Sequence, residues 1–176
     1  MDGERMNDAS LNARLKALVA RLYDEDGLRR QQARLALVRV GRPAVPYLIS
    51  TLSADNKHAR WEAAEALAEI RDPAAAAALV ECLKDDNMDV RWAASRALIS
   101  LKRAGLPPLL EALVTDFSSP RLRQGAHHVL HVLKKVGYLR EEEVKVFEML
   151  HGAFPNTEEL PWQAEAALVA LGRVAD

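Results

Sequence analysis

The chain repeats itself: residues 59–73 read ARWEAAEALAEIRDP, and residues 90–104, 31 positions later, read VRWAASRALISLKRA. Looser copies begin at Arg29, Leu122 and Leu160. A period of this length is typical of proteins built from stacked helical hairpins. A single hairpin cannot bury its own apolar face, so successive copies must stack and cover one another.

Three positions of each copy carry the same kind of apolar residue. Counted from the first residue of a copy, position 5 is alanine, position 9 is leucine and position 12 is aliphatic. These positions lie on one stripe of a helix, and the small residue at position 5 lets a neighbouring helix approach closely. The stripe consists of Ala33, Ala63, Ala94, Ala126 and Ala164, then Leu37, Leu67, Leu98, Leu130 and Leu168, then Val40, Ile70, Leu101, Leu133 and Leu171.

A shorter apolar segment precedes each copy, and polar capping residues such as Asn56 and Asn87 separate the two. The sequence therefore predicts an all-α, right-handed α-solenoid of about five hairpins and ten helices over residues 11–172. A flexible N-terminus (1–10) and a C-terminal tail (173–176) flank it. Long helices are expected near 28–40, 57–71, 88–102, 119–136 and 158–172, and short ones near 11–22, 43–53, 73–84, 105–115 and 141–151.

The composition agrees with closely packed helices, because 49% of the 176 residues are hydrophobic but only 5% are aromatic. The first ten residues carry acids and no apolar segment, and no later stretch resembles a membrane span. We therefore expect a soluble, cytoplasmic protein. Cys82, the single cysteine, stands in the apolar run ALVECL and is expected to be a core residue.

Charge alternates along the chain although the net charge is only -1. Residues 1–50 carry nine basic and six acidic side chains, and residues 51–90 carry four and nine. Residues 91–140 carry nine and two, and residues 141–176 carry two and eight. In a solenoid these blocks become neighbouring slabs, so slabs of opposite sign are expected to attract one another weakly.

The segment 59–73 resembles the PBS-lyase type of HEAT repeat, whose usual pattern is VRxxAAxALGxIGDPxAVPxLxxxLxD. The resemblance extends over most of the chain beyond about residue 28 and is strongest over 55–115. It implies a HEAT-repeat solenoid. It leaves the function open, because the family includes bilin lyases, lyase-like chaperones, a metal-dependent hydroxylase and adaptors that only bind proteins.

Position 2 is arginine in four copies and Pro161 in the fifth. The resemblance implies a structural ladder in which each arginine pairs with an aspartate of the preceding loop through charge-assisted hydrogen bonds. The ladder arginines are Arg30, Arg60, Arg91 and Arg123, and the candidate acids are Asp26, Asp55, Asp86 and Asp116.

The hydroxylase relatives bind two irons through His-Glu pairs at positions 3 and 4. Here Glu62 is the one matching glutamate and no histidine occurs at position 3, so these positions do not supply a di-iron site. Glu62, Glu65 and Glu69 follow helical spacing and are expected on a solvated helix face. We assign no catalytic residues and expect no cofactor.

His127 and His131 have the spacing of two zinc ligands on one helical face. His128 stands where a metalloprotease has its glutamate, and no third ligand is evident nearby, although His58 and His151 are candidates. We interpret the three histidines of this helix as packing residues and predict no metal.

The free face of the long helices is the best candidate for a binding site. Position 3 places all three tryptophans in one row, and tryptophan is common in binding hot spots. In a solenoid this row follows the concave side, so we predict a groove for a protein or peptide. The alternative is that the tryptophans pack against the neighbouring repeats. The proposed groove contains Gln31, Trp61, Trp92, Gln124 and Trp162 (position 3), Glu65, Arg96 and His128 (position 7), and His58 and Asp89 (before position 1), where Leu28 and Arg121 also stand.

A chain with such a groove would act as a non-catalytic adaptor, scaffold or chaperone-like protein. Two other functions are alternatives to this role. One is a lyase-like enzyme or a chromophore-protein chaperone related to the bilin lyases. The other is nucleic-acid binding through the basic segment 91–140. A sequence pI near 6.5 argues against a general phosphate binder.

Overall fold

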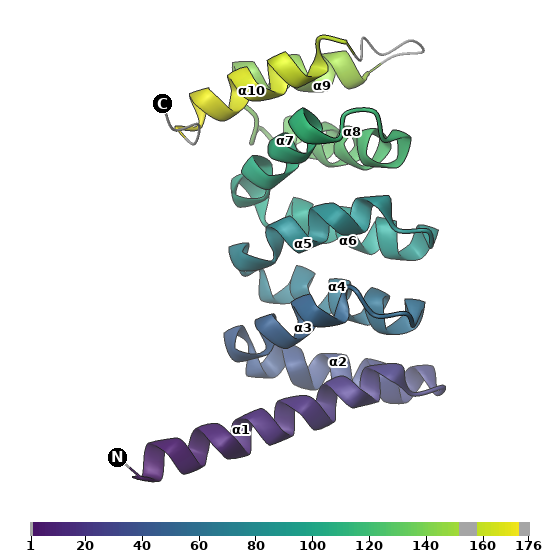
Figure 1. The fold of residues 1–176 in the computed structure, drawn as a ribbon, viewed down its shortest axis with the longest axis vertical. Coiled ribbons are helices and arrows are strands. Elements are labelled where there is room, and N and C mark those ends of the chain that lie inside the picture. Colours follow the sequence, from purple (N-terminus) through teal and green to yellow (C-terminus); the bar gives the residue numbers. More distant parts are fainter. Residues whose placement is uncertain (1, 152–157, 173–176) are drawn as a thin grey trace.

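The structure, a computed structural model, describes residues 2–151 and 158–172, and every regular element in these ranges is a helix. The helices follow one another along one long axis (Figure 1), so the all-α solenoid is confirmed. The α-helices are α1 (Asp2–Ala20), α2 (Gly27–Val40), α3 (Val45–Thr51), α4 (Lys57–Ile70), α5 (Ala76–Glu81), α6 (Met88–Ser100), α7 (Leu106–Thr115), α8 (Pro120–Lys135), α9 (Glu141–Leu150) and α10 (Leu160–Ala170). Short 3-10 helices join them: η1 (Arg21–Tyr23), η2 (Arg42–Ala44), η3 (Pro73–Ala75), η4 (Cys82–Lys84) and η5 (Lys102–Gly105).

The N-terminal helix is longer than its apolar residues predicted. α1 begins at Asp2, so most of the segment 1–10, which was predicted to precede the first helix, belongs to it. Once the second half of a helix is held by packing, extension toward the N-terminus adds one hydrogen bond for each residue ordered. The predicted tail 173–176 lies outside the described residues. Within the described part of the chain, no helix has the length and apolarity needed to span a bilayer.

The repeated apolar stripe forms the core. All five alanines at position 5 and all five leucines at position 9 are buried. Burying one leucine side chain stabilises a fold by roughly 1.5–3 kcal/mol, and the alanines let adjacent helices come close enough to bury the leucines.

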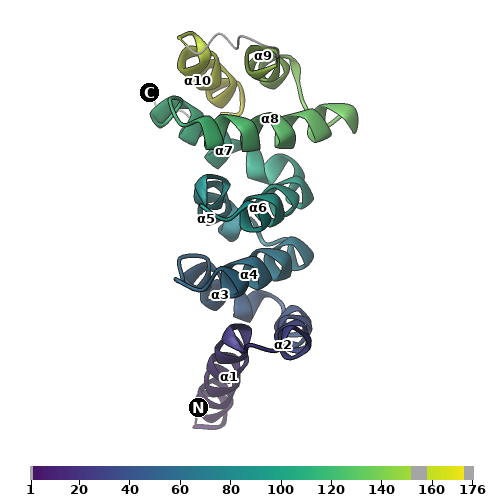
Figure 2. The ribbon, with the colours of Figure 1, turned by 90° about the vertical axis from the view of Figure 1, so that its right-hand side faces the viewer.

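The helices form two layers (Figure 2). Layer B contains α2, α4, α6 and α8, each packed on the next, and layer A contains α1, α3, α5 and α7. The last pair reverses this order, because α9 packs on α8 and α10 packs on α7. The fifth long helix therefore belongs to layer A and does not continue the row of long helices.

The reversal begins at the loop after α8. Arg103 of η5 donates one hydrogen bond to the Tyr138 carbonyl oxygen at 2.7 Å and one to Glu143 Oε1 at 2.8 Å. Glu143 is buried in the first turn of α9. These contacts tie the start of α9 to η5. α9 then packs on α8, and the chain reaches layer A again only at α10.

Gly125 marks a close approach between α8 and the preceding hairpin. A Cβ atom at this position would lie 2.9 Å from Leu83 Cδ2 and 3.1 Å from Leu83 Cβ. Leu83 is fully buried, so its side chain has little room to move.

We expect Gly125→Ala to destabilise the fold by about 1–3 kcal/mol, the usual cost of overpacking. Helix propensity alone predicts the opposite, a gain of about 1 kcal/mol. Urea denaturation followed by circular dichroism measures the difference. Leu83→Ala combined with Gly125→Ala should be more stable than the sum of the two single changes predicts, and simple additivity would contradict the steric explanation.

Candidate functional site

The four arginines at position 2 make one repeated contact. Each donates from Nη1 to two successive backbone carbonyl oxygens of the loop before its own helix, at 2.7–3.1 Å. These carbonyls precede a helix start and have no partner in that helix, so the guanidinium supplies the donors they need. The acceptors are the carbonyls of Asp24 and Glu25 for Arg30, of Ala54 and Asp55 for Arg60, of Asp85 and Asp86 for Arg91, and of Phe117 and Ser118 for Arg123.

The predicted pairing with aspartate side chains of the preceding loop is wrong. The side chain of Asp26 instead caps α2, where it accepts from the Leu28 backbone N–H. Asp116 pairs with Lys84 at 3.3 Å. Asn56, Asn87 and Ser119 cap α4, α6 and α8 in the same way as Asp26 caps α2. Because the capping side chains end these loops, the arginines reach past them to the backbone.

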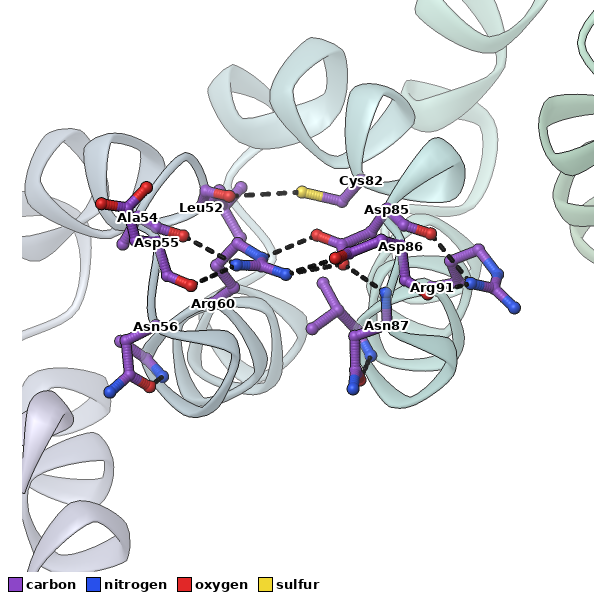
Figure 3. A network of polar contacts seen from close by, with 12 residues as sticks. Leu52, Ala54, Asp55, Asn56, Arg60, Cys82, Asp85, Asp86, Asn87 and Arg91 are labelled. Atoms are coloured by element: carbon purple, nitrogen blue, oxygen red, sulfur yellow. Dashed lines mark hydrogen bonds and ion pairs between the residues drawn. The ribbon is translucent and has the colours of Figure 1, made fainter. Parts of the chain in front are cut away.

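Arg60 also donates to the loop before α6, in the next hairpin (Figure 3). Its Nε and Nη2 donate to the two carboxylate oxygens of Asp85 at 2.7 and 2.9 Å, and Nη2 also donates to Asp86. Burial raises the pKa of Asp85, but the hydrogen bonds from Arg60 and from the Asn87 backbone N–H outweigh it and hold the pKa below 3.8. The hydrogen bond to Asp85 is the main cause that raises the pKa of Arg60.

Two glutamates of α4 that were expected in solvent are buried. Glu62 accepts a hydrogen bond from Arg34 Nε at 2.9 Å, and Glu65 accepts two from Arg96 Nη1 at 2.9 and 3.0 Å. Burial raises the pKa of Glu62 although Arg34 opposes this. Only Glu69 is exposed, as predicted. The adjacent helices α2 and α6 supply the arginines, and a single helix pattern does not contain that information.

The three tryptophans have three different environments. Trp61 on α4 is half-buried against the core. Trp92 on α6 is 56% exposed and lies with its ring centroid 4.8 Å from that of His128 on α8. Trp162 is 79% exposed but belongs to α10 in layer A, so it is not part of the row on layer B.

Two cavities flank Trp92 along layer B. One, of about 250 Å³, lies between α6 and α8, and the other, of about 290 Å³, lies between α4 and α6. The α4–α6 cavity is lined by Lys57, His58, Trp61, Asn87, Asp89 and Trp92. The α6–α8 cavity is lined by Leu83, Met88, Arg91, Trp92, Ser95, Arg121, Gln124, Gly125 and His128.

The cavities bring together six of the ten residues predicted for the groove, namely His58, Trp61, Asp89, Trp92, Gln124 and His128. Gln31 is exposed on α2, and Arg96 is exposed but bound to the buried Glu65. Met88 and Gly125 were missed. Gly125 has a signal in the sequence, because position 4 carries a side chain in each of the other four copies.

The histidines of α8 and α9 gather around Phe147. The rings of His127 and His151 lie 5.2 and 5.3 Å from that of Phe147, and His127 Nε2 lies 3.0 Å from His151 Nδ1. Burial, and then the charge of His151, lower the pKa of His127. In the part of the chain that the structure describes, no three His, Cys, Asp or Glu side chains are placed to hold a metal ion.

Comparison with known proteins agrees with this architecture. Residues 15–99 match the family model for HEAT repeats, so this part of the chain consists of HEAT repeats, and the hairpins beyond it continue the same stack. No curated protein matches the sequence.

Solved structures extend the likeness to most of the chain. A chain in the complex of CpcE and CpcF of phycocyanin lyase from Nostoc sp. PCC7120 superposes with a TM-score of 0.58 and 25% identity, covering 87% of this chain and 98% of that one. An engineered protein gives a TM-score of 0.41 at 20% identity, covering 88% of this chain and 77% of that one. A designed armadillo repeat protein gives 0.43 at 20% identity, covering 96% and 86%. The protein is therefore similar to a phycocyanin lyase subunit over nearly its full length.

The Arg60 contact gives a test at the α4–α6 seam. We expect Asp85→Asn to lower the free energy of unfolding at pH 7 by about 1.5–3 kcal/mol, the usual contribution of a hydrogen bond to a charged group. Asp86→Asn is the matched control, because Asp86 bonds the same arginine from a side chain that is 83% exposed. It should cost less than about 1 kcal/mol.

The effect of Asp85→Asn should also depend on pH. A carboxylate whose pKa is lowered by folding stabilises the fold above its unfolded pKa, here near 3.8, and this stabilisation is lost as pH falls through the folded pKa. The difference from wild type should be constant from neutral pH down to about pH 5 and shrink below about pH 4. Denaturation curves at several pH values measure it. Equal losses for Asp85→Asn and Asp86→Asn would contradict the assignment.

Proposed function

We propose that this HEAT-repeat protein is a non-catalytic binding module that holds a segment of another protein against layer B, around Trp92. One observation carries the proposal. A tryptophan that is 56% exposed stands between two adjoining cavities, so one large side chain borders both. Tryptophan residues in such positions commonly dominate the binding energy of protein interfaces.

The distribution of other apolar side chains supports the same surface. Of the eight large hydrophobic side chains exposed in the described residues, four lie on α2 and α6 of layer B. They are Leu28, Leu35, Met88 and Trp92. Met88 borders the α6–α8 cavity beside Trp92, and adjacent exposed apolar side chains favour a docking site.

The surface is also held in place before any partner arrives. Arg34 and Arg96 tie α2 and α6 to the buried glutamates of α4, and Arg60 ties α4 to the loop before α6. A preorganised surface loses less conformational entropy on binding. The similar phycocyanin lyase chain was solved in a complex of two proteins, CpcE and CpcF, which supports association with another protein.

A lyase-like function is the second candidate, supported by the 25% identity to a chain of the phycocyanin lyase complex. The cysteine of this chain is poorly suited to a reaction that such a lyase could catalyse. Cys82 is buried, and burial raises the pKa of its thiol to about 12. A bilin-transfer assay with purified protein separates the two functions, because a binding module does not accelerate transfer.

The binding proposal is tested by comparing two exposed tryptophans. Wild type, Trp92→Ala and Trp162→Ala are immobilised and used to capture proteins from cells that express the chain, with quantitative mass spectrometry of what is retained. A hot-spot tryptophan contributes about 2 kcal/mol or more, so we expect Trp92→Ala to reduce capture of the specific partner about 10- to 30-fold. Trp162→Ala should leave it unchanged.

Circular dichroism and thermal melting confirm that each variant is folded. The proposal fails if the folded Trp92→Ala variant captures the same proteins as wild type, or if Trp162→Ala loses them equally.

A further inference from the structure

Arg60 and Arg91 hold the same position in successive repeats but have different partners. The forward edge of Arg60, formed by Nε and Nη2, is filled by the carboxylate of Asp85 at 2.7 and 2.9 Å. Figure 3 shows the Asp85–Asp86 loop between the two arginines, with Arg91 on the far side of it. Arg91 bonds that loop only through Nη1, at 2.8 and 3.1 Å to the Asp85 and Asp86 carbonyls.

The forward edge of Arg91 lacks the acid that Arg60 has. Counted back from the first residue of the next repeat, Phe117 stands where Asp85 stands one repeat earlier, and Ser118 replaces Asp86. The acid of this loop, Asp116, pairs with Lys84 at 3.3 Å. Among the described residues, no carboxylate forms an ion pair with Arg91.

The α6–α8 cavity borders the same arginine. Arg91 lines the cavity together with Arg121, whose exposed side chain makes a single long hydrogen bond, 3.3 Å to the Lys84 carbonyl. Met88 and Trp92 supply an apolar wall, and none of the lining residues is acidic. The volume of about 250 Å³ is below the range of roughly 300–1,000 Å³ usual for small-molecule sites. It suits one or two side chains of a peptide.

We propose that the α6–α8 cavity binds an aspartate or glutamate of a partner segment, with Arg91 and Arg121 holding the carboxylate and Trp92 and Met88 contacting an adjacent apolar side chain. The partner carboxylate takes the place that Asp85 fills at Arg60, where the protein already contains the matching arginine–carboxylate fork. This inference rests on the proposed binding function and specifies the chemistry of the partner.

An acidic peptide fits the surface better than a nucleic acid does. A phosphate backbone is negative along its whole length. The neighbouring cavity on the same row is lined by both Asp89 and Lys57, so the row carries acidic as well as basic side chains. One or two acids beside apolar residues match this alternation of charge, and a continuous polyanion does not.

The test uses random peptides displayed on phage and selected against immobilised wild-type protein. We expect the selected peptides to be enriched in Asp or Glu next to Leu, Phe, Trp or Met. The strongest binder is then synthesised with a fluorescent label, together with a copy in which the acid is replaced by its amide. Fluorescence polarisation measures the affinity of both peptides for wild type, Arg121→Gln, Arg91→Lys and Trp92→Ala.

The acid-to-amide change and Arg121→Gln should each weaken binding about 10-fold or more, as expected for a charged hydrogen bond. Combined, they should weaken it little further, because both remove the same contact. Arg91→Lys keeps a charge but not the planar fork and should also weaken binding. Arg14→Gln is the matched control, an exposed arginine of α1, and should have no effect.

The results that would contradict the cavity proposal differ from those that would contradict the binding function. Peptides without acids that bind Arg121→Gln as well as wild type, yet require Trp92, overturn this inference and leave the binding function standing. Peptides that bind independently of both Trp92 and Arg121 contradict both proposals. Salt-sensitive binding of a single-stranded oligonucleotide that depends on Arg121 and exceeds peptide binding would make the cavity a phosphate site.

Discussion

The contact on which the structure depends is the arginine at position 2 donating to two carbonyl oxygens of the loop before its own helix. Carbonyls at such a loop have no partner within the helix, and leaving them buried and unpaired would be costly. Arg30, Arg60, Arg91 and Arg123 remove that cost in four successive repeats. The same contact uses Nη1 and leaves Nε and Nη2 available for the next repeat, as at Arg60. Where an acid meets these atoms, as Asp85 meets Arg60, it seals the seam between hairpins. Where none does, as at Arg91, a charged cavity remains.

Alternating charge blocks along the chain become ion pairs between stacked helices. Arg34 of the first basic block bonds Glu62 of the acidic block, Glu65 bonds Arg96 of the second basic block, and Arg103 bonds Glu143 of the last acidic block. The glutamates of these pairs are buried, so the contacts are more than the weak attraction between solvated slabs that the composition suggested. Removing one partner from such a pair leaves a buried charge unpaired, which is strongly destabilising. The pairs therefore hold the register of the stack and, with it, the positions of the side chains around Trp92.

A repeat scaffold separates the residues that maintain the stack from those that are free to bind. The stripe of alanines and leucines and the ladder of arginines recur in nearly every repeat because every repeat must pack in the same way. Functional differences then arise where one repeat departs from the others. Gly125, in place of a larger residue, falls at the seam between α6 and α8, and Phe117 precedes α8 where the previous repeat has Asp85. The similarity to a phycocyanin lyase subunit concerns the scaffold, whereas these departures are features of this chain.

The sequence by itself determined the repeat, the helices, the buried stripe and the capping residues, because all of these depend on contacts within a helix or between neighbours of constant register. It also located Trp92, Gln124 and His128 on one surface. Only the tertiary structure decided that Glu62 and Glu65 are buried, since their arginine partners belong to other helices. The tertiary structure also separated Trp162 from Trp61 and Trp92, because α9 packs on α8 in the place expected for α10, and α10 packs on α7. Periodicity predicts which face of a helix is covered, but the partner that covers it depends on where the connecting loop leads the chain.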